Sequence, residues 1–240
     1  MKRFFEIVFS DFEKNFLPDL CFICESELDK NHFILCENCL RLLKPVPLPR
    51  CPKCGYPLKK IKCQRCYHLR PKFDIAYQIF EFNDILRKLV HRLKYEGYLK
   101  LADFFAGIMC EFAPDNYFSD IDIVCWIPDK KLFYKGYNQS YLIAKAIAKR
   151  INKILCDKNL IKKVRLTYSQ TKFHNYKDRY ENIRDSFEVS NPLYFYQKGI
   201  LIVDDVMTSG NTINELAKKL KKYKPKVIKA LTLAQAYCKF

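Results

Sequence analysis

The sequence predicts an α/β protein in which helices flank a parallel sheet and a small cysteine-rich module precedes it. One observation lies in residues 199–212, where an apolar run leads into two aspartates, a loop of hydroxyl residues and glycine, and then a helical pattern. This order is typical of a buried parallel strand followed by a loop and a helix. The other observation is that eight cysteines gather in close pairs before residue 70, apart from that pattern.

Asp204 and Asp205 end the apolar run and are therefore expected at the carboxyl edge of the sheet, where open α/β folds bind ligands. The next loop combines backbone N–H groups and hydroxyls with a glycine at a helix N-terminus, which suits a phosphate dianion. Two carboxylates beside it would repel a second phosphate and suit the vicinal hydroxyls of a ribose. We therefore predict a site for a ribose 5-phosphate group. An ordinary capped turn needs only one such residue, whereas this loop has a run of them: Thr208, Ser209, Gly210, Asn211 and Thr212.

The paired cysteines predict metal binding. Two residues separate the members of each pair, which lets both thiolates reach one tetrahedral ion. The pairs are Cys21/Cys24, Cys36/Cys39, Cys51/Cys54 and Cys63/Cys66. We expect two sites of four cysteines each, made by successive pairs and holding one or two structural zinc ions. Pairing of the first pair with the third is the alternative. Because thiolate-bound zinc needs a reducing compartment, a cytoplasmic location is expected.

Hydrophobic patterning predicts the remaining elements. Four strands are expected, at residues 73–82, 121–127, 200–205 and 227–233. Helices are expected at residues 83–95, 99–112, 140–151 and 212–222, with an amphipathic helix within residues 1–20. No apolar run is long enough to span a bilayer. The domain organisation expected is the N-terminal helix (1–20), a zinc-binding module (21–70) and an α/β domain (71–240).

The formal net charge of +17 favours an anionic partner, with nucleic acid first, although a lysine-rich composition alone would also give this charge. Arg65 and the lysines around the second cysteine site are expected either to contact phosphates or to be solvated. The same holds for the basic face of helix 83–95, which includes Lys94. In the turn after strand 121–127, three lysines could neutralise a pyrophosphate, with an exposed basic turn as the alternative. They are Lys130, Lys131 and Lys135. The polar stretch 165–187 is a candidate lid.

Residues 199–212 resemble the signature of the type I phosphoribosyltransferases, which bind phosphoribosyl pyrophosphate (PRPP) with Mg²⁺. This resemblance implies that Asp204 and Asp205 hold the ribose hydroxyls and the metal, and that residues 208–212 surround the 5-phosphate. The paired cysteines, Lys135–Gln139 and the order Gln170, Arg179, Asn182, Phe187 are similar to the ComF (ComFC) family of bacterial competence proteins. The similarity extends from about Cys21 to the end of the chain. The family usually has arginine where Lys135 stands, and a lysine lacks its bidentate fork.

The ComF resemblance implies a role in natural transformation, with PRPP, single-stranded DNA and other DNA-uptake proteins as partners. The many tyrosines and phenylalanines, together with the basic charge, would suit stacking on unpaired bases. An active phosphoribosyltransferase with an unknown acceptor is the alternative. A zinc-ribbon RNA-binding protein with a vestigial phosphoribosyltransferase fold is a third interpretation, and the intact Asp204–Asp205 pair argues against it.

Overall fold

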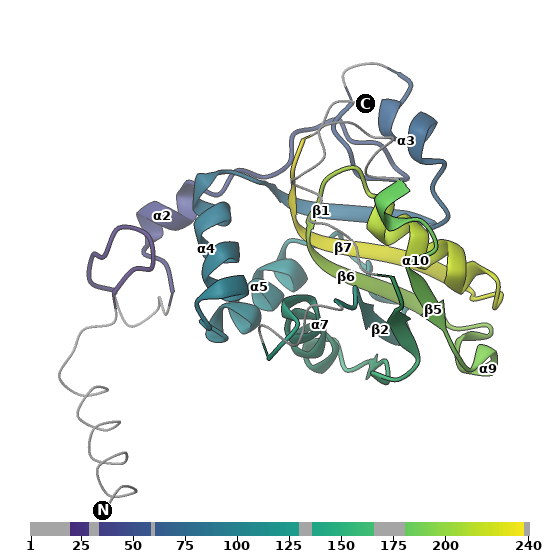
Figure 1. Cartoon of the computed structure of the whole chain (residues 1–240). Coiled ribbons are helices and arrows are strands. Elements are labelled where there is room, and N and C mark those ends of the chain that lie inside the picture. Colours follow the sequence, from purple (N-terminus) through teal and green to yellow (C-terminus); the bar gives the residue numbers. More distant parts are fainter. Residues whose placement is uncertain (1–19, 29–33, 59–60, 130–135, 166–180, 238–240) are drawn as a thin grey trace, which may run out of the picture. The chain divides into compact units, whose positions relative to one another are not determined.

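A computed structural model describes residues 20–28, 34–58, 61–129, 136–165 and 181–237 of the chain (Figure 1). The chain forms two compact units, Met1–Leu43 and Lys44–Phe240. The predicted N-terminal helix falls on residues 1–19, which lie outside the described residues. In the part of the chain that the structure describes, no helix is long and apolar enough to cross a membrane.

The larger unit is built on a five-stranded parallel sheet with the strand order β1-β7-β6-β2-β3. The strands are β1 (Ile75–Glu81), β2 (Ile123–Trp126), β3 (Ile154–Leu155), β6 (Gly199–Met207) and β7 (Val227–Gln235). The predicted parallel α/β fold is thus confirmed. The apolar runs of β6 and β7 are almost wholly buried, as expected for parallel strands covered on both faces.

Four long helices connect these strands, and all four were predicted. They are α4 (Asp84–Tyr95), α5 (Lys100–Glu111), α7 (Gln139–Arg150) and α10 (Asn211–Lys221). The crossovers β1 to β2 and β2 to β3 run one way along the sheet, whereas β6 to β7 runs the other way. Because such crossovers are right-handed, α5 and α7 cover one face and α10 covers the other. In Figure 1, α5 and α7 lie together and apart from α10.

Side-chain caps fix where two of these helices begin. The side chain of Asn83 accepts a hydrogen bond from the backbone N–H of Leu86 at 3.0 Å and so caps α4. Asn138 accepts one from the N–H of Tyr141 at 2.8 Å and so caps α7. Each cap satisfies a backbone donor that the first helical turn leaves without a partner.

A two-stranded antiparallel sheet, β4 (Ile161–Lys163) with β5 (Phe187–Val189), and the short helix α9 (Pro192–Phe195) lie between β3 and β6 in the chain. Ile183 and Phe187 are buried, so the end of the predicted lid segment 165–187 belongs to the body of the protein. Its residues 166–180 lie outside the described residues.

The second cysteine segment, which includes α3 (Gln64–Leu69), joins the larger unit. The N–H of Ala76 in β1 donates to the carbonyl of Lys53 at 2.8 Å, and the side-chain amide of Gln78 donates to the carbonyl of Cys54 at 3.1 Å. The first cysteine segment, with α2 (Glu37–Arg41), belongs to the smaller unit. The sequence grouped residues 21–70 together, whereas these contacts associate the second cluster with the sheet.

Gly199 at the start of β6 offers a test of the sheet packing. A Cβ atom added there would lie 1.7 Å from the carbonyl oxygen of Asp120. We therefore expect Gly199→Ala to lower the free energy of unfolding by about 1–3 kcal/mol or more, measured by chemical denaturation. As a matched control, Gly107→Ala in α5 meets only ordinary contacts of 3.8 Å and should be neutral or slightly stabilising. Equal stability of the two variants would contradict this account of β6.

Candidate ligand site at the carboxyl end of the sheet

The two adjacent aspartates lie in the second half of β6, which continues two residues beyond the predicted strand end. Successive side chains of a strand point to opposite faces, so Asp204 and Asp205 meet different neighbours. Asp205 is buried and Asp204 is half-buried. The structure therefore places both carboxylates at the predicted edge of the sheet.

Helix α7 begins beside Asp204. The hydroxyl of Ser140, in the first turn of α7, donates to Oδ1 of Asp204 at 2.7 Å. The backbone N–H of Asp205 donates to the same oxygen at 3.0 Å. These two donors hold the Asp204 carboxylate in a defined orientation.

Lys94, in the last turn of α4, forms an ion pair with Asp205. Its side chain is only 24% exposed and that of Asp205 is 6% exposed. The expectation that Lys94 lies on a solvated basic face was wrong, because α4 packs with this lysine turned toward the carboxylates. Its position four residues after the buried Val90, on the flank of the apolar face, is the sequence signal that could have indicated this.

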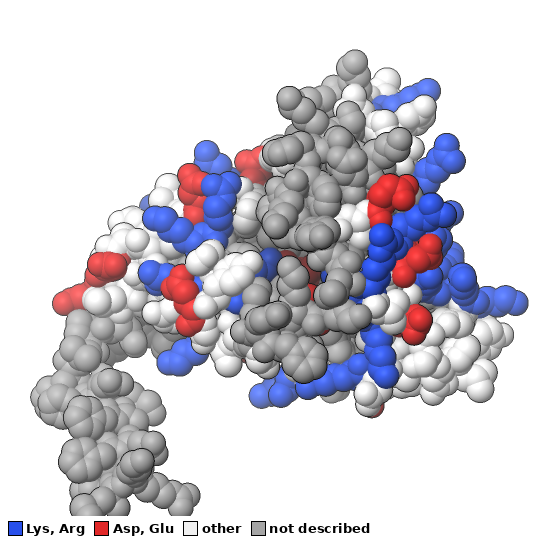
Figure 2. Space-filling model, viewed as in Figure 1, with Lys and Arg blue, Asp and Glu red and all other residues white. Residues whose placement is uncertain are grey.

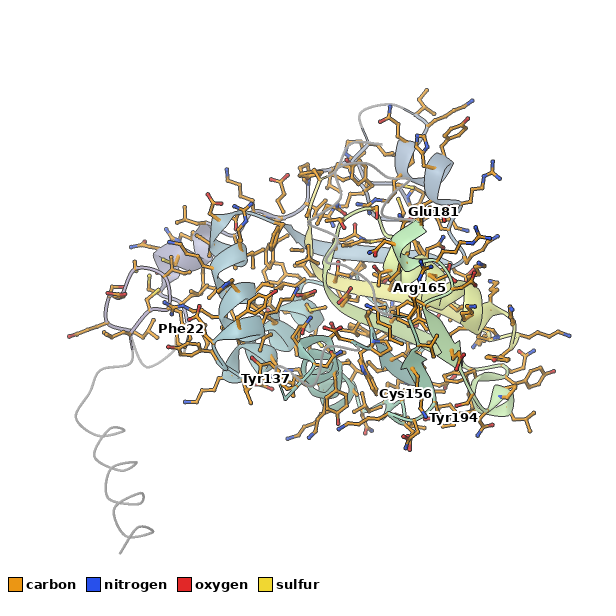
Figure 3. The ribbon with its side chains drawn as sticks, viewed as in Figure 1. Phe22, Tyr137, Cys156, Arg165, Glu181 and Tyr194 are labelled. Atoms are coloured by element: carbon orange, nitrogen blue, oxygen red, sulfur yellow. The ribbon has the colours of Figure 1, made fainter. Side chains whose placement is uncertain are left out.

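The segment Gly136–Gln139 organises the surroundings of this pair. The hydroxyl of Tyr137 donates to the carbonyl of Leu93, the residue before Lys94. The side-chain amide of Asn138 donates to the carbonyl of Ile127, just after β2, at 3.0 Å. This segment therefore ties the end of α4, the end of β2 and the start of α7 together around the aspartates. Tyr137 is among the residues labelled in Figure 3, as are Arg165 and Glu181, which border the undescribed part of the candidate lid.

Burial and proximity of like charges change the protonation of Asp204. Burial, followed by repulsion from Asp205, raises the pKa of Asp204 to about 7, while the Ser140 hydroxyl and Lys94 act in the opposite direction. Burial disfavours the charged form of Lys94, but the Asp205 carboxylate outweighs it and raises the pKa of Lys94. Lys94 is thus charged at neutral pH, and the unliganded site has a proton on Asp204 part of the time.

The loop after β6 has the geometry expected of an anion-binding turn. Ser209 and Asn211 are buried, and Gly210 has a φ of +85°, which residues with a side chain rarely adopt. Asn211 is the first residue of α10, whose first-turn N–H groups have no partner within the helix. The predicted residues Thr208 to Thr212 are therefore together at this helix start, and their binding of phosphate stays a prediction. Lys130, Lys131 and Lys135 lie outside the described residues.

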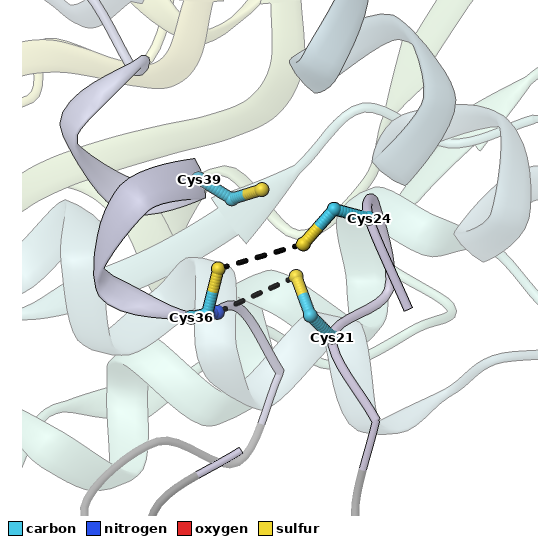
Figure 4. Close-up of side chains that lie close together, drawn as sticks. All are labelled: Cys21, Cys24, Cys36 and Cys39. Atoms are coloured by element: carbon cyan, nitrogen blue, oxygen red, sulfur yellow. Dashed lines mark hydrogen bonds between the residues drawn. The ribbon is translucent and has the colours of Figure 1, made fainter. Parts of the chain in front are cut away.

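Each half of the cysteine-rich region brings four sulfur atoms together. Cys21, Cys24, Cys36 and Cys39 form one cluster, and Cys51, Cys54, Cys63 and Cys66 form the other, with all ligand atoms of a cluster within 4.8 Å of one another. In the first cluster, shown in Figure 4, Sγ of Cys24 lies 3.6 Å from Sγ of Cys36. In the second, the corresponding distances are 3.6 Å for Cys51–Cys66 and 3.5 Å for Cys54–Cys63. Sulfur atoms around a tetrahedral zinc ion lie about 3.8 Å apart, so both clusters fit zinc. The pairing of successive pairs is confirmed.

Comparison with known proteins agrees with an α/β domain preceded by a zinc-binding module. The model of the phosphoribosyl transferase domain family matches residues 138–239, and that of the double zinc ribbon domain matches residues 14–68. The chain is 26% identical over 217 residues to the DNA utilization protein YhgH of Salmonella typhi, which covers 85% of this chain and 91% of that protein. It is 27% identical over 232 residues to Competence protein F of Haemophilus influenzae (92% of this chain, 99% of that protein). Competence protein ComFC of Streptococcus pneumoniae is 24% identical over 205 residues (84% and 87%).

The pKa of Asp204 predicts a pH-dependent stability. The pKa of Asp204 is higher in the folded than in the unfolded chain. Its carboxyl group therefore contributes most to the free energy of unfolding at low pH, and this contribution is lost as the pH rises through about 7. Asp204→Asn, which stays neutral, should therefore stabilise the unliganded protein increasingly from pH 4 to pH 8, by more than about 1.4 kcal/mol at the upper end. Thermal unfolding of both proteins across this range would measure it.

Ser140→Ala gives a second test of the same site. Loss of the hydroxyl donor should raise the pKa of Asp204 further and move the transition in stability to higher pH. A pH-independent difference between wild type and Asp204→Asn would contradict the assignment.

The geometry of the sulfur clusters predicts two zinc ions per chain, measured by elemental mass spectrometry. Replacing Cys21 and Cys24 by serine should remove one ion and leave the larger unit folded, because the first cluster belongs to the smaller unit. Replacing Cys51 and Cys54 should remove the other ion and also lower the melting temperature of the larger unit. A single replaced pair that removes both ions would contradict two independent sites.

Proposed function

The chain is a homologue of the ComF-type competence proteins, and on this basis we propose that it binds PRPP with Mg²⁺ and handles single-stranded DNA during natural transformation. The observation that carries the ligand assignment is the order of groups at the carboxyl end of β6. Two carboxylates are followed directly by a glycine-containing turn at the start of a long helix. The ligand must therefore offer hydroxyls or a cation at one end and a phosphate at the other.

In this proposal Asp204 and Asp205 accept hydrogen bonds from the ribose hydroxyls and help to hold Mg²⁺, which prefers oxygen ligands. The N–H groups and hydroxyls of residues 208–212 bind the 5-phosphate. Lys94 compensates the charge of Asp205 in the unliganded site and lies where it can also favour the negative charge of a pyrophosphate. Lys130, Lys131 and Lys135 remain candidates for contacts with the pyrophosphate.

Surface charge supports the DNA part of the proposal. In Figure 2 a group of Lys and Arg side chains lies over the region of α10, with a few acidic side chains among them. Several of the lysines at the end of α10 and in the turn after it are exposed: Lys221, Lys222, Lys224 and Lys226. With a net charge of +17, such a surface favours phosphate backbones and makes binding salt-dependent. In this proposal the protein binds incoming single-stranded DNA in the cytoplasm and acts together with other DNA-uptake proteins.

Transfer of the phosphoribosyl group from PRPP to an acceptor is the second candidate function. It is favoured by the match of residues 138–239 to the phosphoribosyl transferase domain. Such a reaction needs little from side chains beyond stabilisation of the departing pyrophosphate. Mg²⁺ would supply most of that charge stabilisation when bound, while Asp204, Asp205 and Lys94 would orient the ribose and balance charge.

Calorimetric titration with PRPP and Mg²⁺ tests the proposal. Wild type should bind, and Asp204→Ala/Asp205→Ala should bind at least about 100-fold more weakly, since each lost hydrogen bond from a ribose hydroxyl to a charged carboxylate contributes about 1.5–3 kcal/mol. The matched control Glu111→Ala/Asp115→Ala removes two exposed carboxylates and should bind like wild type. Failure of a folded, zinc-loaded wild type to bind PRPP would overturn the ligand assignment.

Addition of an oligothymidylate to the same titrations separates the two functions. A change in PRPP affinity on adding DNA, with no release of pyrophosphate, would support a DNA-handling factor that senses PRPP. Release of pyrophosphate in the presence of a candidate acceptor would favour the transferase. Absence of oligothymidylate binding at low salt would contradict the DNA role.

A further inference from the structure

A buried arginine connects the second cysteine cluster to the loop that follows β6. We propose that Arg65 is a positioning residue that holds this loop in its ligand-binding conformation and so makes the loop depend on the second cluster. The proposal rests on the phosphate-binding role proposed above for residues 208–212. The sequence left Arg65 as a phosphate contact or a solvated side chain; the structure shows it fully buried, with 0% exposure.

The guanidinium of Arg65 spans three segments of the larger unit. Its Nη2 atom donates to the carbonyl of Thr208 at 2.9 Å and to Oε1 of Gln235, at the end of β7, at 2.5 Å. Its Nη1 atom lies 3.4 Å from the carbonyl of Cys54, and the group stacks 4.3 Å from the ring centre of Tyr56. Burying a guanidinium costs free energy that an apolar side chain of similar size would avoid, and its hydrogen bonds to separate segments favour a role in positioning over one in packing alone.

The hydrogen bond to Thr208 determines the direction of a neighbouring donor. A trans peptide is planar, and its C=O and N–H bonds point in opposite directions. Since the carbonyl of Thr208 points toward Arg65, the N–H of Ser209 points away from the cysteine segment. Arg65 therefore fixes the orientation of one of the N–H groups proposed to bind the phosphate.

A second set of contacts holds the other end of the same loop. The side chain of Asn214, in the first turn of α10, donates to the carbonyl of Leu69 at 3.0 Å and accepts from the N–H of Lys72 at 2.6 Å. A Cβ atom at Gly210 would lie 3.0 Å from Cδ2 of Leu69. The loop is thus held at both ends by α3 and the residues that follow it.

The cysteines connect this support to the metal. Arg65 lies between Cys63 and Cys66, and α3 begins directly after Cys63. Metal binding by these two thiolates would fix the start of α3 and hence the place from which Arg65 reaches Thr208. Loss of zinc from the second cluster would release the loop. Loss of zinc from the first cluster should leave the loop unchanged, because that cluster belongs to the other unit.

The test compares Arg65→Lys with wild type in the full chain by zinc content, hydrogen exchange of the peptide covering residues 207–216, and PRPP affinity. A lysine keeps the charge but cannot bridge the same acceptors. Zinc content should stay at the wild-type value, exchange in this peptide should rise, and PRPP should bind at least about tenfold more weakly. The matched control is Arg41→Lys. Arg41 lies two residues after Cys39, and its side chain is 74% exposed. All three measurements should stay at their wild-type values in this variant.

Asn214→Ala provides a second variant that alters no cysteine and leaves Arg65 in place. It should also raise exchange in the loop at unchanged zinc content. Wild-type exchange in both Arg65→Lys and Asn214→Ala would overturn the proposal. If wild type does not bind PRPP but exchange rises in both variants, the proposed ligand is wrong while the positioning role of Arg65 is supported.

Discussion

Two adjacent carboxylates at the end of a buried strand are the constraint around which this site is arranged. Burial and repulsion from Asp205 both disfavour the charge of Asp204, so the pair needs compensating partners. The chain supplies Ser140 as a donor to Asp204 and Lys94 as a cation to Asp205. Helices α4 and α7 must therefore end and begin near β6. The contacts of Tyr137 and Asn138 hold them there.

The opposite side of the same strand end is supported by the second cysteine cluster. Arg65 reaches the carbonyl of Thr208, and Leu69 and Asn214 connect α3 to the first turn of α10. A short cysteine-rich segment cannot bury much apolar surface and depends on metal for its own fold. Here it is also a structural part of the larger unit. The two clusters share the spacing of two residues within each cysteine pair but differ in what they support.

The principal elements of the larger unit could be predicted from its sequence because their signals are local. The apolar runs of β6 and β7, the cap at Asn83 and the paired cysteines each report on a few neighbouring residues. Lys94 and Arg65 could not be placed in this way. In sequence both look like members of basic clusters, and only the packing of α4 and α3 against the sheet turns them inward.

The sequence by itself determined the parallel α/β fold, the two sulfur clusters and the order of carboxylates and loop at the end of β6. These follow from hydrophobic period, ligand spacing and the geometry of strand ends. The tertiary structure alone decided which cation pairs with Asp205, which hydroxyl donates to Asp204 and which residues of the cysteine segment contact the loop after β6. Those contacts join residues far apart in the chain, and such a pairing is set by how whole elements pack.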